Sequence, residues 1–304
     1  MKLKHFLVLS LAFVGAVLPL IPQEKKDESE SVTERYEVVV TATRLEIPAR
    51  EVASAVTVIP AKELESWKRI SALEVLRDVA GLFTVQSGGP GAAASAFIRG
   101  ANSEHTLVLV DGAELNDPMN PSRSFDLAHL TLENIDRLEI LRGPQSPLYG
   151  SDALGGVINI ITKKGVGKPK VTLASSAGSY GTFINRGGIS GSAKNITYSF
   201  GLQHSAMQGV SAASSSYPGN SESDSWRNLS LSGRLGMSLG KTVEVDLTAR
   251  STLAKSDVDN FGGPYGDDPN NIQDYKHVLL RGQIRGLFLK NRWEQKLAIS
   301  LVDS

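Results

Sequence analysis

The chain has 304 residues, with 32 basic and 32 acidic side chains and no cysteine. The even charge balance produces no overall field that would attract nucleic acid, which we therefore exclude as a partner. The lack of thiols excludes disulfides, thiolate metal sites and a cysteine nucleophile. A hydrophobic content of 41% suits a soluble protein, and it equally suits a transmembrane barrel, in which apolar and polar residues alternate.

Residues 1–22 predict an export signal. Lys2 and Lys4 precede an apolar run from Phe6 to Ile21, and a charged stretch follows it. The run is short for a membrane-spanning helix, and a permanent N-terminal anchor is the alternative interpretation. We expect the mature chain to be exported.

Residues 23–47 form a polar lead that has little apolar surface to bury, so we expect it to be flexible. Within it, the branched residues between Tyr36 and Thr43 favour an extended chain. The sequence shows linker rather than a hairpin partner beside this segment. We therefore expect it to be a strand that joins the sheet of another protein.

Residues 48–165 have the pattern of a small α+β domain. Short apolar segments between glycine-rich loops predict strands over 52–59, 83–86, 97–99, 106–110, 137–141 and 157–162. A helix is predicted over 61–70, and Ser71 with Glu74 forms a capping box for a second helix that ends near Gly81. We expect a small mixed sheet with short helices.

Residues 166–304 alternate between apolar and polar side chains over long stretches. One stretch has apolar residues on one face and polar residues on the other: Val243, Val245, Leu247, Ala249 and Leu253 against Glu244, Asp246, Thr248 and Arg250. Long strands of this kind are typical of transmembrane barrels, whereas the strands of a soluble β-sandwich, the alternative, are shorter. About seven strands fit before Ser304, and an odd, open set leaves unpaired edges in lipid. We expect the antiparallel β-barrel to be incomplete in this chain, which is then a fragment or the product of a truncated gene.

Four motifs occur in a fixed order along the first half of the chain. They are VVVTATR at 38–44, FIRG at 97–100, TLVLVDG at 106–112 and ILRGPQSPLYGSDALGGVINIIT at 140–162. Their order and spacing resemble the plug of TonB-dependent outer-membrane receptors, and within that family they look most similar to the cobalamin receptors. The resemblance covers residues 36–165. It implies a barrel filled by a plug domain, located in the outer membrane and surrounded by its lipid.

The resemblance implies active uptake of a scarce metal chelate, with cobalamin favoured over an iron siderophore or haem. Energy comes from TonB and its inner-membrane complex, which grasp a short peptide called the TonB box. The residues that match this peptide are Glu37, Val38, Val39, Val40, Thr41 and Ala42. Such a segment can add an edge strand to its partner by β-augmentation. An ordinary first strand of the plug is the alternative interpretation.

Arg99 and Arg142 match the family's plug arginines, which pair with glutamates on the barrel wall. A guanidinium inside a barrel needs a carboxylate partner, and its planar shape suits bidentate pairing. The matching wall glutamates are expected beyond Ser304. Two arginines in surface turns are the alternative.

Two plug loops are expected to meet the ligand by resemblance to the cobalamin receptors. The candidate residues are Gln86, Ser87, Gly88, Asn116, Asp117 and Asn120. A barrel loop carries four carboxylates that suit calcium, namely Asp257, Asp259, Asp267 and Asp268. Ordinary solvated loops are the alternative in both cases, and we expect no other cofactor.

Enzymatic chemistry is excluded by the motifs. Ser103, His105 and Asp111 lack a nucleophile elbow, so they do not form a hydrolytic triad. The Gly88–Gly91 loop is not followed by the lysine and serine of a phosphate-binding loop. A signal-transducing receptor and a non-transporting remnant are the other functional classes that we keep open.

The TonB-box interpretation predicts the effect of Val39→Pro in a complete receptor. Proline removes a backbone donor and fixes a φ angle that does not suit a paired strand. Uptake should fall sharply while ligand binding at the cell surface persists, as measured with radiolabelled chelate. Normal uptake by this variant would contradict the assignment.

Overall fold

The computed structural model describes residues 38–39, 47–48, 51–52, 54–116, 123–211, 213, 216, 223–259, 271–290 and 292–304. The expected signal peptide and most of the polar lead lie outside these ranges. Within the described part of the chain, no helix is both long enough and apolar enough to cross a membrane.

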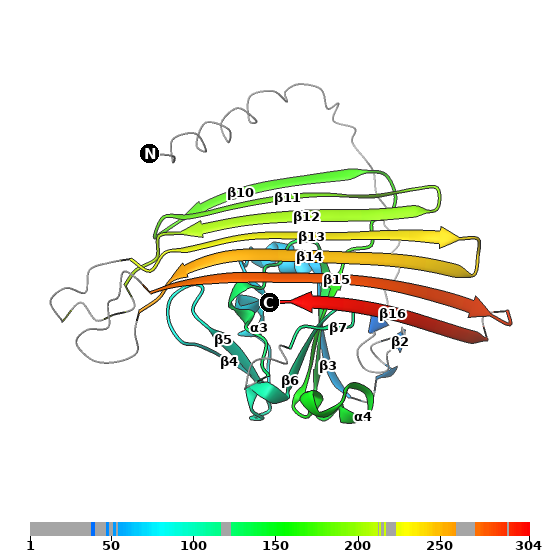
Figure 1. Cartoon of the computed structure of the whole chain (residues 1–304), viewed down its shortest axis with the longest axis horizontal. Coiled ribbons are helices and arrows are strands. Elements are labelled where there is room, and N and C mark those ends of the chain that lie inside the picture. Colours follow the sequence, from blue (N-terminus) through cyan, green and yellow to red (C-terminus); the bar gives the residue numbers. More distant parts are fainter. Residues whose placement is uncertain are drawn as a thin grey trace, which may run out of the picture. The chain divides into compact units, whose positions relative to one another are not determined.

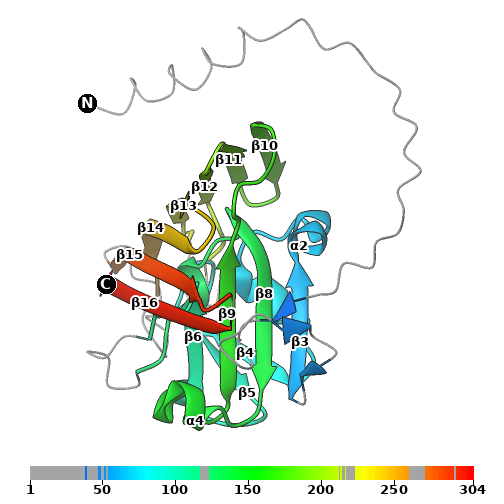
Figure 2. The ribbon, with the colours of Figure 1, turned by 90° about the vertical axis from the view of Figure 1, so that its right-hand side faces the viewer.

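The plug domain is built on a five-stranded mixed sheet with the strand order β3-β8-β9-β6-β7 (Figure 2). Its strands are β3 (Ala55–Pro60), β6 (Thr106–Val110), β7 (Ala113–Glu114), β8 (Ile135–Arg142) and β9 (Gly156–Thr162). The β6–β9 pair is parallel, and the other pairs are antiparallel. A separate pair joins β4 (Leu82–Gln86) to β5 (Ala94–Ile98). The short helices are α2 (Ala61–Trp67), α3 (Ala72–Leu76) and α4 (Ser146–Tyr149). The predicted α+β class is confirmed.

The two predicted helices are shorter than the sequence pattern indicated. Helix α2 ends because Lys68 adopts a left-handed conformation with φ of 53°. The predicted cap of α3 is present, since the Ser71 hydroxyl accepts from the Glu74 N–H at 3.5 Å. The helix nevertheless stops at Leu76 rather than near Gly81. Gly81 instead precedes β4, and its carbonyl accepts from the Arg99 N–H at 3.0 Å. Strand β7 and helix α4 were not predicted.

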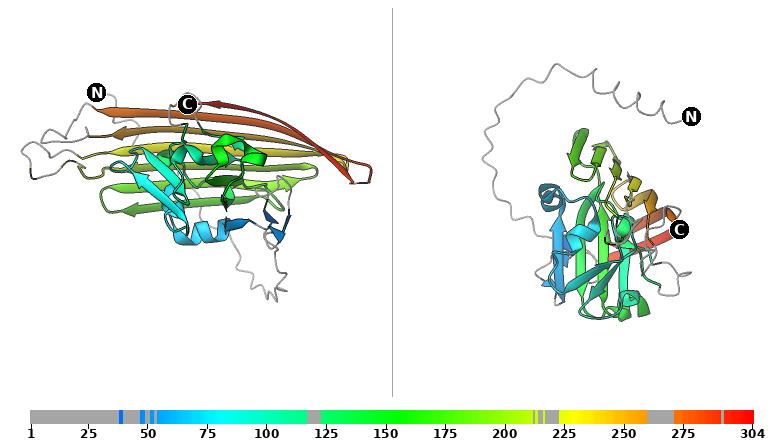
Figure 3. Two further views of the ribbon diagram at one scale, coloured as in Figure 1. Left: turned by 90° about the horizontal axis from the view of Figure 1, so that it is seen from below. Right: turned by 90° about the vertical axis from the view of Figure 1, so that its left-hand side faces the viewer.

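The strands that follow the plug form one antiparallel sheet of seven strands, which we call the wall sheet (Figures 1 and 3). They follow chain order: β10 (Lys170–Gly178), β11 (Thr182–Ala193), β12 (Ile196–Met207), β13 (Trp226–Leu239), β14 (Val243–Asp257), β15 (Ile272–Phe288) and β16 (Trp293–Asp303). Connections 208–225 and 258–271 leave from one end, and the short connections 194–195, 240–242 and 289–292 close the other. In outer-membrane barrels the short turns face the periplasm.

In its middle strands, β12 to β15, the wall sheet exposes an apolar face and buries a largely polar one. Exposed leucines include Leu231, Leu235, Leu247 and Leu253, which are 42–52% accessible. The alternate residues of the same strands are buried: Asn228, Ser230, Ser232, Arg234, Thr248, Arg250 and Thr252. A soluble sandwich would place the leucines inside, so the pattern favours the barrel interpretation over the sandwich.

This inverted polarity predicts different behaviour for the two parts of the chain. The plug has its own core, which includes Leu76, Ile98, Leu138 and Ile160, so residues 36–165 should stay soluble without detergent. Residues 166–304 should aggregate, because they expose apolar side chains and unpaired strand edges. Separate expression followed by centrifugation measures the difference. A soluble, monomeric C-terminal fragment would mean that these strands form a sandwich.

Candidate functional site

The plug and the wall sheet belong to the same compact unit, Glu37–Ser304, and they meet along a polar interface. Wall side chains donate hydrogen bonds to carbonyl groups of the plug backbone. Gln203 Nε2 donates to Ile70 O at 3.0 Å, and Asn228 Nδ2 donates to His129 O at 3.2 Å. These donors supply partners to plug carbonyls at the interface.

A buried ion pair joins Glu133 of the plug to Arg250 of β14. Arg250 Nη2 lies 2.8 Å from Glu133 Oε1, and both side chains are only 2% exposed. The same Nη2 donates to the backbone oxygen and the hydroxyl of Thr131, at 2.9 and 3.0 Å. Removing one partner of such a pair leaves a bare buried charge, which costs roughly 3–5 kcal/mol.

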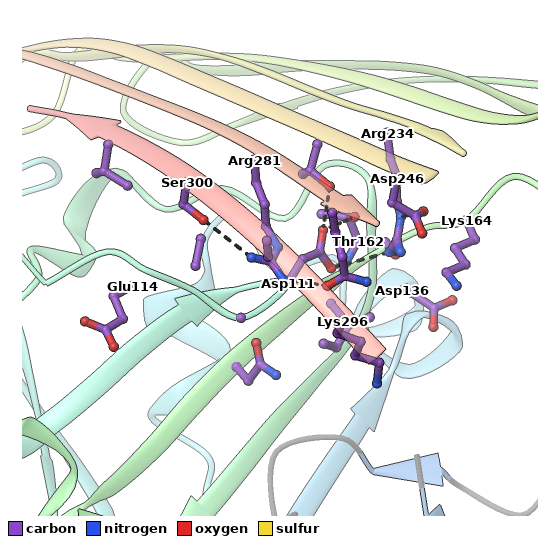
Figure 4. Close-up of a pocket in the computed structure, with 18 of the residues that line it drawn as sticks. Asp111, Glu114, Asp136, Thr162, Lys164, Arg234, Asp246, Arg281, Lys296 and Ser300 are labelled. Atoms are coloured by element: carbon purple, nitrogen blue, oxygen red, sulfur yellow. Dashed lines mark hydrogen bonds and ion pairs between the residues drawn. The ribbon is translucent and has the colours of Figure 1, made fainter. Parts of the chain in front are cut away.

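A second charged contact is centred on Asp111, which follows β6 (Figure 4). Within the plug, its carboxylate accepts from the Thr162 N–H at 3.0 Å and from the Thr162 hydroxyl at 2.5 Å. From the wall, Thr248 Oγ1 donates to it at 3.2 Å, and Arg234 Nη1 lies 3.5 Å away. Arg234 Nε also lies 3.1 Å from Asp246 on the neighbouring strand. Arg234 therefore links a plug carboxylate to a wall carboxylate.

A cavity of about 1230 Å³ lies beside this second contact, between the plug and the wall sheet. Asp111, Arg234 and Asp246 line it, together with Arg281 and Arg285. Its wall residues come from β13, β14, β15 and β16, and those of β13 and β14 lie toward the short connections, which face the periplasm in a barrel. Both charge signs are present, so the cavity is not a dedicated anion site. Glu133 and Arg250 are not among its lining residues.

The predicted anchors Arg99 and Arg142 bond within the plug. Arg142 Nη2 donates to Thr57 Oγ1 at 2.9 Å, and Nη1 donates to the Ala80 carbonyl. Arg99 packs against Gly143, where an added Cβ would lie 3.1 Å from its Nη1. Neither forms an ion pair with a wall carboxylate in the described residues, so their anchoring role stays a prediction.

The sequence-based reasoning missed the anchors that the structure does show. They are Asp111 and Glu133 on the plug, with Arg234 and Arg250 on the wall. The sequence motifs led us to consider Asp111 only as a turn residue and as a member of a hydrolytic triad, which we excluded. Both arginines occupy the polar face of an alternating strand, and an arginine that faces a barrel interior is itself a signal for a carboxylate partner.

The predicted ligand residues lie in two separate places. Gln86 bonds to the Arg77 side chain and to Gly89 O, both at 2.8 Å, and the Ser87 hydroxyl donates to Ala93 O. Gly88 lies in the same loop. This loop contacts the wall near the long connections, since Ser256 Oγ donates to Gly91 O at 3.4 Å.

Asn116 lines the cavity instead and closes a loop of the plug. Its Oδ1 accepts from the Val108 N–H, and its Nδ2 donates to Thr106 O and Arg123 O. These three hydrogen bonds within the plug give Asn116 a structural role that accounts for its side chain without a ligand. Asp117 and Asn120 lie outside the described residues, so the second predicted ligand loop is not tested.

The predicted calcium ligands that are described have other partners. The Asp257 carboxylate accepts from the Ser225 hydroxyl and the Asp259 carboxylate from the Ala213 N–H, both at 2.6 Å. Asp267 and Asp268 lie outside the described residues. In the part of the chain that is described, no three acidic or histidine side chains gather as a metal site, and calcium binding stays a prediction.

The TonB-box segment has a partner within the chain. Val38 and Val39 form a short antiparallel pair with Pro48 and Ile47, designated β1 (Val38–Val39) and β2 (Ile47–Pro48). The expectation that no hairpin partner exists was therefore wrong, because this pairing joins two segments of the same chain. The remaining candidates Glu37, Val40, Thr41 and Ala42 lie outside the described residues.

His129 connects the plug to the wall near the long connections. Trp226 Nε1 donates to its Nδ1 at 3.3 Å, and the Tyr275 ring lies 4.4 Å from its ring. Burial lowers the pKa of His129, and the nearby Asp126 carboxylate opposes this shift only in part. The imidazole is therefore neutral near pH 7, as its acceptor role at Nδ1 requires.

This lowered pKa predicts that acid weakens the plug–wall contact. The unfolded state takes up a proton more readily than the folded state, so the free energy of unfolding falls as the pH drops below about 6.5. Urea unfolding at a series of pH values measures the effect. The acid-dependent loss should be smaller in His129→Gln, and an unchanged loss in that variant would contradict the assignment.

Comparison with known proteins agrees with this arrangement. Residues 48–157 match the family model of the TonB-dependent receptor plug domain, which is a receptor domain and not an enzyme. The structure resembles the ferripyoverdine receptor of the outer membrane of Pseudomonas aeruginosa, with a TM-score of 0.67 and 17% identity over 87% of this chain and 36% of that one. The alcaligin outer-membrane receptor of Bordetella pertussis gives 0.64 and 19%, over 91% and 44%. A siderophore receptor of Acinetobacter baumannii gives 0.63 and 23%, over 81% and 39%.

These identities establish likeness of fold, and the chain spans 36–44% of the length of these three structures. The confirmed features are the plug and a sheet of barrel strands beside it. The chain therefore contains a TonB-dependent receptor plug domain, followed by strands that have the fold of these receptors' barrels.

Proposed function

We propose that this chain is part of an outer-membrane receptor that takes up a metal chelate with energy supplied through TonB. The observation that carries the proposal is the inverted wall sheet, whose buried polar face bonds to a TonB-dependent receptor plug domain. Its exposed leucines suit contact with lipid hydrocarbon. In a complete barrel the plug would fill the lumen, so a transport cycle would have to move it.

We propose a ferric siderophore as the ligand class ahead of cobalamin. The three similar structures are receptors described with ferripyoverdine, alcaligin and siderophores. They give no support to the preference for cobalamin that plug sequence alone suggested. Identities of 17–23% establish fold and not ligand, so the binding experiment below decides the class of chelate.

The ligand is proposed to meet the plug at the loop over residues 86–93. This loop lies beside Trp226 and Ser256, at the end of the wall with the long connections. Long connections face the outside in bacterial outer-membrane barrels. Gly91 fits closely there, because a Cβ at this position would lie 2.2 Å from the Ser256 hydroxyl.

The proposed partner at the opposite face is TonB, which would take Val38 and Val39 into its own sheet. The pairing of these residues with β2 involves only two residues on each strand. So short a pair gives way easily to a longer intermolecular strand, because main-chain bonds supply the affinity of β-augmentation.

Titration calorimetry on the complete receptor tests the ligand class. Ferripyoverdine and ferric alcaligin represent the siderophores, and cyanocobalamin with calcium and haem represent the other chelates. We expect heat of binding from a siderophore and none from cyanocobalamin. Binding of cyanocobalamin alone would restore the earlier preference, and binding of none of the four would remove the proposed ligand class.

A further inference from the structure

We propose that the two charged plug–wall contacts have different roles. Glu133–Arg250 is a hinge that keeps the plug attached to the wall, and Asp111–Arg234 is a latch that separates first when the plug moves. The purpose of this movement rests on the proposed function, but the order of separation is a property of the contacts themselves.

The two halves of the latch each keep a partner when they separate. Asp111 retains both bonds from Thr162, which belongs to the plug. Arg234 retains Asp246, which belongs to the wall. Neither charge is left bare, so opening the latch loses the weak 3.5 Å contact, the Thr248 hydrogen bond and the hydrogen bond that Arg234 Nη1 donates to Thr162 O at 3.3 Å.

The two residues of the hinge, in contrast, have no second bonding partner within their own domain among the described residues. Among the described residues, the Arg250 side chain bonds only to the plug, namely to Glu133 and the two oxygens of Thr131. Among the described residues, the Glu133 carboxylate pairs with Arg250 and accepts no hydrogen bond from the plug. Separation at this point would leave two unpaired buried charges, which is the costly outcome.

Solvent access separates the two contacts, whereas close packing of the plug against the wall occurs near both, at Gly165 beside the latch and at Gly201 beside the hinge. Beside the hinge, β12 comes so close to the plug that a Cβ at Gly201 would lie 2.9 Å from Asn134 Cβ. Asn134 also donates to Ser232 Oγ at 3.4 Å. The latch residues line the cavity (Figure 4), so water can replace their mutual contacts as they part. Opening at the latch enlarges this cavity, whereas the hinge side stays closed.

The wall offers a matched pair of variants, because both contacts use an arginine on the inner face of neighbouring strands. Arg234 lies opposite Thr248 in the strand register, and Arg250 lies opposite Ser232. Arg250→Gln should sharply reduce the amount of folded receptor in the membrane, and Arg234→Gln should leave it near the wild-type amount. The reverse order would overturn the inference.

Should Arg250→Gln fail to fold, the double variant Glu133→Gln/Arg250→Gln removes both charges together. We expect it to recover much of the folded receptor, because two neutral amides carry no bare charge. No recovery would mean that the hinge does not act through its charges, and the inference would fail.

Local opening can be measured directly, because the chain has no cysteine of its own. Thr248→Cys reports on the latch and Ser232→Cys on the hinge, and both positions are buried. Each variant of the purified complete receptor is treated with a maleimide at rising urea concentration, below the concentration that unfolds it globally. No chelate is needed, so this experiment decides the order of opening even if the proposed ligand is wrong.

We expect the Thr248→Cys labelling rate to rise first, by about tenfold over Ser232→Cys, as a difference of about 1.4 kcal/mol in opening would produce. Arg234→Gln combined with Thr248→Cys should move this opening to lower urea. Equal labelling of both positions at every urea concentration would show that the plug separates as one rigid body. Earlier labelling of Ser232→Cys, or labelling of neither before global unfolding, would equally overturn the inference.

Discussion

The polar inner face of the wall sheet is the constraint on which the rest of this structure depends. A strand that shows leucines to lipid must turn its alternate residues inward, and here these are amides, hydroxyls and arginines. Buried groups of this kind require hydrogen-bond partners. The plug supplies them, so its shape and its exposed backbone carbonyls are as much a requirement of the wall as of the plug itself.

The direction of the interface bonds follows from this constraint. Donors such as Gln203 and Asn228 come from the wall, and the acceptors are largely carbonyls at the turns of the plug. Every residue has a backbone carbonyl, so these contacts place few demands on the sequence of the plug. The charged contacts at Glu133 and Asp111 add specificity, because each needs an arginine at one register position of one strand.

Sequence patterns over a few neighbouring residues correctly predicted the strands that depend only on those residues. The strand at Thr106–Val110 matched its prediction because all five residues are apolar or buried and turn residues flank it. Helix ends were less well predicted, since the left-handed conformation of Lys68 has no strong signal in its residue type. The anchors could not be assigned from sequence. Arg250 meets Thr131 across 119 residues, and alternation shows which face an arginine occupies but not which plug turn lies beneath it.

The placement of the arginines on the wall and of the carboxylates on the plug has a physical reason. An arginine has a long side chain with several donors, so from a rigid strand it can reach both a carboxylate and a carbonyl, as Arg250 does with Glu133 and Thr131. A carboxylate is short, and it suits a tight turn, where Asp111 also ties two plug strands together through Thr162. Placing cations on the wall and anions in plug turns therefore allows an anion such as Asp111 to stabilise its own domain as well as the interface. The more a carboxylate is held within the plug, the less its release from the wall costs, and this difference separates Asp111 from Glu133.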